Sequence, residues 1–144
     1  MEELLGRKVT AKTIAAFNFS GSDQTLTAVY ESSEGVLVAA CVCDSELVLT
    51  AGAALCLVPA AEAQQNLKAK KWDPSLVENF KEVLNVCTQL FLGPQSSRVK
   101  LQGVFVGAEP RPEKAATLLA KPRWRINLQL SIAGYGEGRI AILE

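Results

Sequence analysis

Histidine is absent from this 144-residue sequence. Its absence excludes Ser-His-Asp and Cys-His catalysis, zinc sites with imidazole ligands and a histidine pH switch. An excess of charge of either sign is also missing, because Lys and Arg together number 15, as do Asp and Glu. Proteins that bind a phosphate backbone usually carry a basic excess, so we do not expect nucleic acid as a partner.

The sequence has no long apolar run, and its first residues do not show the pattern of a secretory signal. The most apolar stretch, Leu47–Ala61, contains Thr50, Gly52 and Pro59 and is shorter than the roughly 20 residues that span a bilayer. The chain opens with Met-Glu-Glu, whereas a secretory signal begins with basic and then apolar residues. We therefore expect no membrane partner and a cytoplasmic location.

The 4 cysteines fit a reducing compartment, because each lies within an apolar run. A free thiol packs there as a small hydrophobic group. Cys41 and Cys43 are two residues apart, which on a strand directs both thiols to one face and indicates packing. The spacing to Cys56 and Cys87 is not that of a zinc site, so we expect no metal on this chain.

The sequence does contain enough apolar residues for one folded domain. Apolar residues make up 49% and charged residues 21%, and a chain of this length can bury roughly 70% of its unfolded surface. No linker or internal repeat divides it, so we expect residues 1–144 to form a single domain. The predicted class is α+β: a mostly antiparallel sheet of about six strands, in the order β-β-β-α-α-β-β-β, with two long helices packed on it.

Three short β-favouring segments open the chain and predict an antiparallel meander. The third, Val36–Cys43, is an unbroken apolar run, which is typical of a strand covered on both faces in the middle of a sheet. Near the carboxyl end, Arg123–Ala133 alternates apolar and polar residues, so one face of this strand should be buried and the other wet. At a sheet edge, this strand could pair with a second copy of the chain and form a homodimer. The predicted strands are Lys8–Ile14, Thr25–Tyr30, Val36–Cys43, Arg98–Val106, Arg123–Ala133 and Arg139–Leu143.

The last two strands are joined by a segment with glycine at every second position, residues 134–138. It superficially resembles a phosphate-binding loop, but such a loop opens a helix, and this one precedes a strand. A hairpin turn is therefore predicted.

Capping signals mark the two long helices. Asp44 can cap a helix over Ser45–Leu57, which Pro59 ends. Asp73 can cap a second helix over Pro74–Leu92, because a proline fits the first helical position. Shorter helix-favouring stretches are Ala60–Lys71 and Glu113–Ala120.

The helix predicted over residues 74–92 has two distinct faces. Its apolar residues recur at the spacing of a core-facing stripe: Leu76, Phe80, Val83, Leu84, Cys87, Leu90 and Phe91. A narrow polar stripe lies almost opposite: Glu78, Glu82, Asn85 and Gln89. Within it, Glu82 and Asn85 are neighbours one turn apart, where a carboxylate can bind a partner's cation and a carboxamide can orient a water. A solvated helix face would show the same residue types.

The order of these elements resembles the CheC/CheX/FliY family. The likeness rests on the central strand Val36–Cys43, the Ala-rich helix Ser45–Leu57 and the Glu-Val-Leu-Asn sequence at residues 82–85. Family members dephosphorylate the phosphorylated chemotaxis response regulator, and their signature is Asp or Ser, three residues, Glu, two residues, Asn. Here the Glu and the Asn of the signature are matched, while Glu78 stands where the family has Asp or Ser.

The resemblance implies a phosphatase that accelerates hydrolysis of the phosphoaspartate of a CheY-like regulator. In the family the Glu holds a lysine of the regulator and the Asn orients the attacking water. Glu82 and Asn85 are therefore the expected catalytic pair, with Glu78 and Gln89 as flanking partner contacts. The resemblance also implies that Mg²⁺ belongs to the regulator and that this chain carries no cofactor.

Two alternatives remain open at this point. The first is a non-catalytic module of the same fold that binds partners or a second copy, as in related flagellar-switch proteins. The second is a small-molecule hydrolase. It ranks behind the phosphatase and the non-catalytic module because the sequence reveals no polar pocket for a substrate.

Overall fold

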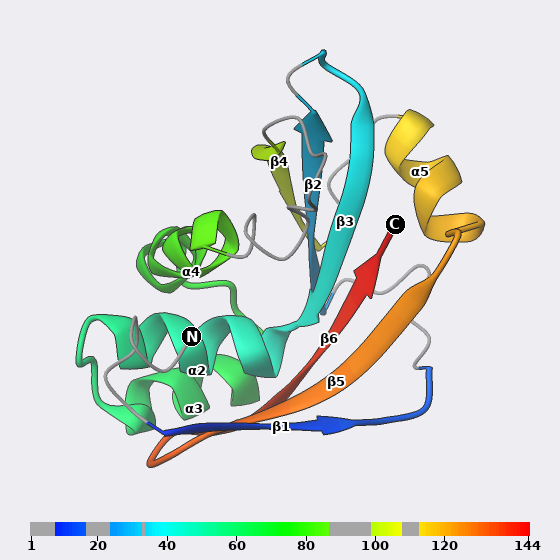
Figure 1. Cartoon of the computed structure of the whole chain (residues 1–144). Coiled ribbons are helices and arrows are strands. Elements are labelled where there is room, and N and C mark those ends of the chain that lie inside the picture. Colours follow the sequence, from blue (N-terminus) through cyan, green and yellow to red (C-terminus); the bar gives the residue numbers. More distant parts are fainter. Residues whose placement is uncertain (1–7, 17–23, 33, 87–98, 108–112) are drawn as a thin grey trace.

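The computed structural model describes residues 8–16, 24–32, 34–86, 99–107 and 113–144 (Figure 1). Along the chain these residues form β1 (Val9–Thr13), β2 (Thr25–Ser32), β3 (Leu37–Asp44), α2 (Ser45–Leu55), α3 (Ala60–Lys68), α4 (Pro74–Val86), β4 (Val99–Val106), α5 (Glu113–Ala120), β5 (Arg125–Ile132) and β6 (Gly136–Leu143). The predicted α+β class is confirmed. Two shorter helices, α3 and α5, accompany the long helices α2 and α4.

The six strands form one sheet in the order β1-β5-β6-β3-β2-β4, and every neighbouring pair is antiparallel. β3 lies in the middle, as its unbroken apolar run predicts. In Figure 1, β1, β5 and β6 pass beneath α2 and α3, while β2, β3 and β4 rise beside α4. The sheet therefore curves around its helical layer.

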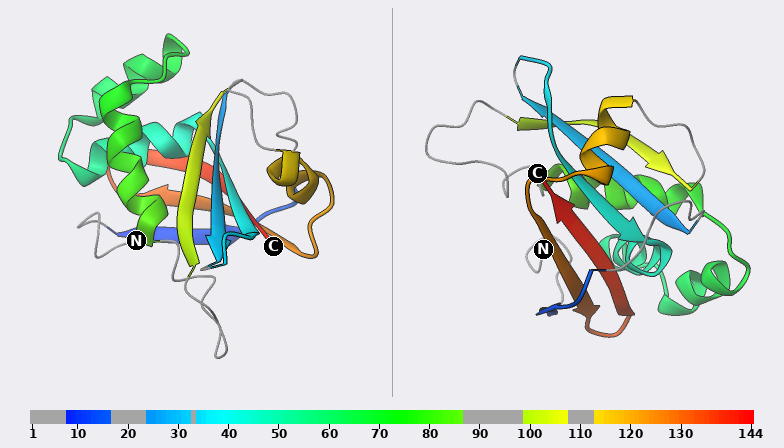
Figure 2. Two further views of the ribbon diagram at one scale, coloured as in Figure 1. Left: turned by 90° about the horizontal axis from the view of Figure 1, so that it is seen from above. Right: turned by 90° about the vertical axis from the view of Figure 1, so that its right-hand side faces the viewer.

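Helices cover both faces of this sheet, as Figure 2 shows: α2, α3 and α4 lie on one side and α5 on the other. The main core lies between the sheet and the larger helical layer. Its largest fully buried side chains include Leu26, Tyr30, Leu47, Leu49, Leu76, Phe80, Leu84 and Ile132. On the opposite face, Ala115 of α5 packs against Val29 and Ala40. β3 is thus covered on both sides.

Two glycines let α2 approach its neighbours closely. A Cβ added to Gly138 of β6 would overlap the backbone of Leu47 in the first turn of α2. A Cβ added to Gly52 would overlap the carbonyl of Leu76 in the first turn of α4. These contacts seat α2 on β6 and α4 on α2 with no room for a side chain between them.

The meander predicted for the first three strands is confirmed for β2 and β3, which pair antiparallel, and wrong for β1. β1 pairs with β5, with Val9 opposite Ile132, and β2 instead lies between β3 and β4. β1 ends at Thr13 and β2 begins at Thr25, and a connection of this length allows β1 to pair with a strand other than β2. Only Val9 of β1 is partly buried, which suits an edge position.

The alternating strand does not lie at a sheet edge, so the condition for its pairing with a second copy is not met, and the expected burial of its apolar face is only partly confirmed. β5 lies between β1 and β6, so it cannot pair with a second copy; within the described chain the edge strands are β1 and β4. Its apolar face is buried only at one end, because Trp124 and Ile126 are 41% and 44% exposed. The first turn of α2 packs against Gly138, and Leu130 is the residue of β5 that pairs with Gly138. Ile126 lies four residues before Leu130 on β5, beyond this contact with α2.

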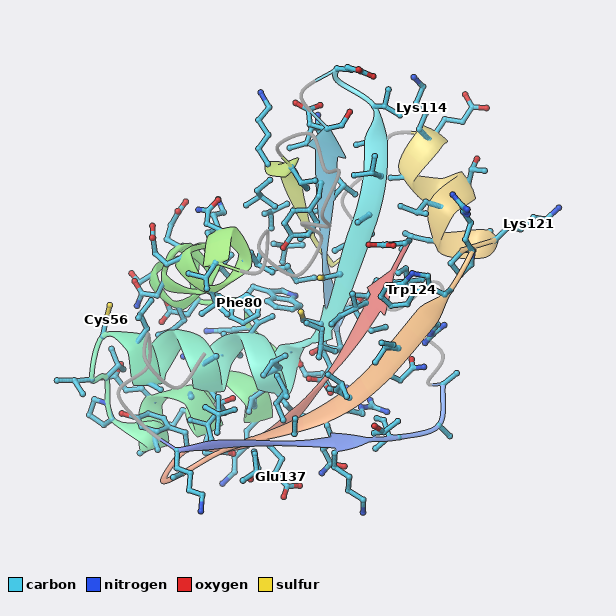
Figure 3. All side chains as sticks on the ribbon, viewed as in Figure 1. Cys56, Phe80, Lys114, Lys121, Trp124 and Glu137 are labelled. Carbon is cyan, nitrogen blue, oxygen red and sulfur yellow. The ribbon has the colours of Figure 1, made fainter. Side chains whose placement is uncertain are left out.

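The prediction that the cysteines are packed as apolar groups is confirmed for the two in β3 and wrong for Cys56, which follows α2. Cys41 and Cys43 are buried and part of the main core. Cys56 is exposed at the end of α2 (Figure 3), because the helix ends before Leu57, which adopts a left-handed φ of 57°. Cys87 lies outside the described residues.

Candidate functional site

Helix α4 carries the polar stripe, and four contacts fix its place. Asp73 caps it as predicted, since its Oδ1 accepts a hydrogen bond from the backbone N–H of Ser75 at 2.9 Å. Phe80 is fully buried between α4 and α2 (Figure 3). Asn79 Nδ2 donates to the carbonyl of Gly52 at 3.1 Å. The Tyr30 hydroxyl of β2 donates to the carbonyl of Leu84 at 2.8 Å.

The predicted core face of α4 is confirmed over the described residues. Its buried side chains are Leu76, Val77, Phe80, Val83 and Leu84. Val77 was not predicted to be among them. The remaining predicted core positions, Cys87, Leu90 and Phe91, lie outside the described residues.

The structure places three of the four stripe residues on the outer side of α4. Glu78, Glu82 and Asn85 are all exposed. Glu78 forms an ion pair with Lys81, with 2.9 Å between Oε1 and Nζ. None of the described residues forms an ion pair with Glu82. Gln89 lies outside the described residues.

On α4 the exposed carboxylate of Glu82 lies one turn from the exposed carboxamide of Asn85. The Lys81 contact partly neutralises Glu78, so the net negative charge on this part of the stripe centres on Glu82. A positively charged side chain of another molecule could approach Glu82 without displacing an ion-pair partner from among the described residues. One turn away lies Asn85, and a carboxamide is a group that can both donate a hydrogen bond to a water and accept one from it. The support beneath both residues is a helix held against the core.

A second polar cluster lies at the amino end of α2. The buried carboxylate of Asp44 accepts hydrogen bonds from the backbone N–H of Leu47 at 2.9 Å and of Arg139 at 3.0 Å. Its Oδ2 also accepts from Arg139 Nε at 3.0 Å. Beside it is a surface pocket of about 130 Å³, lined by Glu46, Gln129, Glu137, Gly138 and Arg139. Glu137 points to the side of the sheet away from the larger helical layer (Figure 3).

Stability should depend on the protonation of Glu46 in this cluster. Burial and the neighbouring Asp44 carboxylate raise the pKa of Glu46, while Arg139 lowers it. A carboxyl group with a raised folded-state pKa contributes stability below its unfolded pKa and loses that contribution as the pH rises through the folded value. We therefore predict that Glu46→Gln raises the unfolding midpoint relative to the wild type at neutral pH, and that the gain shrinks toward about pH 4.

The matched control for this prediction is Glu113→Gln. Glu113 also lies in the first turn of a helix, α5, where a carboxylate interacts favourably with the helix dipole. Both variants lose that interaction, but only Glu46 faces Asp44. Thermal unfolding across the pH range should separate them, and identical pH profiles for the two variants would contradict the prediction.

Two side chains that position α4 were missed from the sequence. Tyr30 belongs to a strand predicted for its apolar content, and nothing local indicates that its hydroxyl reaches a helix 54 residues away. Asn79 gave only a weak signal, as a polar residue beside the core stripe. Within the described chain, no group of three or more His, Cys, Asp or Glu could hold a metal ion. None of the described helices is both long and apolar enough to cross a membrane.

This arrangement of sheet and helices is that of CheC/CheX/FliY-type proteins. The FliM middle domain from Vibrio alginolyticus superposes with a TM-score of 0.59 at 8% identity, covering 99% of this chain and 82% of that one. FliY from Thermotoga maritima gives 0.55 at 11% identity, covering 99% and 78%. A CheX–CheY–BeF₃–Mg²⁺ complex from Borrelia burgdorferi gives 0.50 at 10% identity, covering 99% and 88%.

These likenesses confirm the fold that the sequence resemblance implies. The sequence itself matches no protein-family model and no curated protein. Identities near a tenth show a shared fold, and the activity on that fold must be argued from the site.

Proposed function

We propose that this chain is a cytoplasmic CheX-like phosphatase that accelerates hydrolysis of the phosphoaspartate of a CheY-like response regulator. The observation that carries the proposal is the exposed pair Glu82 and Asn85, one turn apart on α4. The fold supports it, because a CheX of this fold has been solved together with CheY.

In this proposal each residue of the pair has one task. The Glu82 carboxylate binds a lysine ammonium of the regulator and so aligns the two proteins. Asn85 holds a water in line with the phosphorus of the acyl phosphate. The water oxygen forms a bond to phosphorus, the bond from phosphorus to the aspartate oxygen breaks, and the aspartate leaves as a carboxylate. The water's proton passes to the released phosphate or to solvent, and Mg²⁺ stays with the regulator.

The two flanking residues are proposed as partner contacts. Glu78 lies one turn before Glu82 on the same face, and its pair with Lys81 presents both signs of charge to a docking protein. Gln89, which lies outside the described residues, is proposed as a contact from its place in the sequence pattern. Neither takes part in the chemical step of the proposal.

The decisive experiment is phosphate release from a phosphorylated CheY-like regulator. We expect Asn85→Ala to reduce the acceleration by about 100-fold, because a misplaced water loses most of the gain from alignment. Glu82→Ala should mainly raise the regulator concentration needed for half-maximal rate. The controls are Asn66→Ala and Glu62→Ala on α3, which make the same changes outside the stripe. Equal rates for the wild type and Asn85→Ala would refute the enzymatic proposal.

A non-catalytic module of the same fold is the second candidate. It is favoured by the FliM middle domains among the structural neighbours and by Glu78 at the position where the family signature has Asp or Ser. Such a module would bind partners or a second copy of itself. It predicts that Glu82→Ala and Asn85→Ala change neither phosphate turnover nor binding in sedimentation experiments with the regulator.

A further inference from the structure

We propose that Tyr30 is a positioning residue for the turn of α4 that carries Glu82 and Asn85, an inference that rests on the proposed phosphatase function. The Tyr30 side chain is fully buried, and its hydroxyl donates to the carbonyl of Leu84 at 2.8 Å. Leu84 lies between the two residues of the pair. The hydrogen bond therefore acts on the backbone of the functional turn itself.

The other end of this contact is a strand that is paired along both of its edges. Tyr30 of β2 is paired with Ala39 of β3 and with Leu101 of β4, although the register shifts next to it in both pairings. A strand held on both edges cannot follow small movements of a helix above it. The hydroxyl thus sets the position of the Leu84 carbonyl relative to the sheet, and with it the backbone from which Glu82 and Asn85 project.

The Asn79 contact holds a different part of α4. Its side chain donates to Gly52 of α2 at 3.1 Å, more than one turn before Asn85. Two of the contacts that fix α4 are therefore side-chain hydrogen bonds to neighbouring elements, one from Asn79 to α2 and one from Tyr30 of β2 within the motif. Loss of the Tyr30 hydroxyl should remove only the second of these hydrogen bonds, leaving the helix docked and the pair less well aligned.

Alignment of this kind affects turnover more than binding. Misplacing a reacting group by about 1 Å can cost about 100-fold in rate, whereas the charges that attract the regulator are unchanged. For Tyr30→Phe we expect kcat to fall about tenfold. The regulator concentration for half-maximal rate should stay nearly constant.

Tyr135→Phe is the matched control, because its hydroxyl also donates to a backbone carbonyl, that of Val58, at 2.8 Å. Tyr135 is also buried, although slightly less than Tyr30, and Val58 lies outside α4. This variant should keep the wild-type kcat. Equal kcat values for the two variants, or a change in half-saturation alone for Tyr30→Phe, would overturn the inference.

Hydrogen exchange separates failure of this inference from failure of the proposed function. Tyr30→Phe should speed amide exchange in residues 81–86, and Tyr135→Phe should not. If the wild type has no phosphatase activity, the proposed function is refuted, and the exchange rates still decide whether Tyr30 orders the turn. Unchanged exchange in Tyr30→Phe would refute the tether even in an active enzyme.

A measurement on the unmutated sequence tests the inference even if Tyr30→Phe does not fold. The chain has only 2 tyrosines, so replacement by 3-fluorotyrosine gives two ¹⁹F signals, and each Phe variant that folds assigns them both. Adding a CheY-like regulator loaded with BeF₃ and Mg²⁺ should shift one signal, that of Tyr30, and leave the other in place. A shift of neither signal would overturn the coupling between Tyr30 and the docking face.

Discussion

Replacing Gly138 by alanine is expected to lower the free energy of unfolding by about 3 kcal/mol. The added Cβ would overlap the backbone nitrogen and Cα of Leu47. Backbone cannot rotate away as a side chain can, and the Leu47 N–H is also held at 2.9 Å by Asp44 Oδ1. Relief of the overlap must therefore lift the first turn of α2 from β6. Urea unfolding would measure the loss.

Gly103→Ala provides the control, because Gly103 also lies in a strand, β4. Its added Cβ would approach the Phe105 ring, with 3.2 Å to Cζ, and no backbone atom lies as close. Phe105 is only partly buried and its ring can shift, so we expect a change within about 1 kcal/mol. Similar losses for the two variants would show that strand glycines matter here for a reason other than the close approach of α2.

The two glycine contacts connect the sheet to the candidate site through two successive packing contacts. Gly138 seats α2 on β6, and Gly52 seats the start of α4 on α2. α4 then presents Glu82 and Asn85 outward. Displacement of α2 would thus be passed to the helix that carries the site, so Gly138→Ala should impair any activity of the pair as well as stability.

Features with a local cause were predictable from the sequence. Asp44 and Asp73 both cap helices as expected, because a carboxylate before a helix satisfies free backbone N–H groups whatever the remainder of the fold. The outward placement of Glu82 and Asn85 follows from helical periodicity in the same way. The central position of β3 follows from its unbroken apolar run.

Features that depend on distant parts of the chain were not predictable. β1 pairs with β5, and the sequence of neither strand indicates which strand is its partner. Trp124 and Ile126 belong to an apolar face, but burial depends on how far α2 reaches along β5. On the other face of the same strand Asn127 is 8% exposed and accepts a hydrogen bond from Arg125 at 2.7 Å, although alternation predicted a wet position.

Asp44→Ala is expected to cost on the order of 3 kcal/mol, the second large loss of stability. The Asp44 carboxylate is the acceptor for two backbone N–H groups, those of Leu47 and Arg139, in a buried place. Alanine leaves both donors without this partner. Asp73→Ala removes a less buried cap whose hydrogen bonds are to residues of α4 alone, whereas Asp44 also binds the backbone of β6. It should therefore cost about 1 kcal/mol. Denaturant unfolding of both variants makes the comparison.

A double-mutant cycle with Arg139→Gln separates the ion pair from the backbone contacts. The Arg139 side chain is 46% exposed, so water can replace much of its interaction with Asp44 Oδ2. We expect Arg139→Gln alone to cost about 1 kcal/mol or less, and Asp44→Ala to remain strongly destabilising in its presence. If instead the two single changes cost the same and the double change costs no more, the ion pair would be the main contribution. Asp44 would then stabilise the fold through charge rather than by joining α2 to β6 through their backbones.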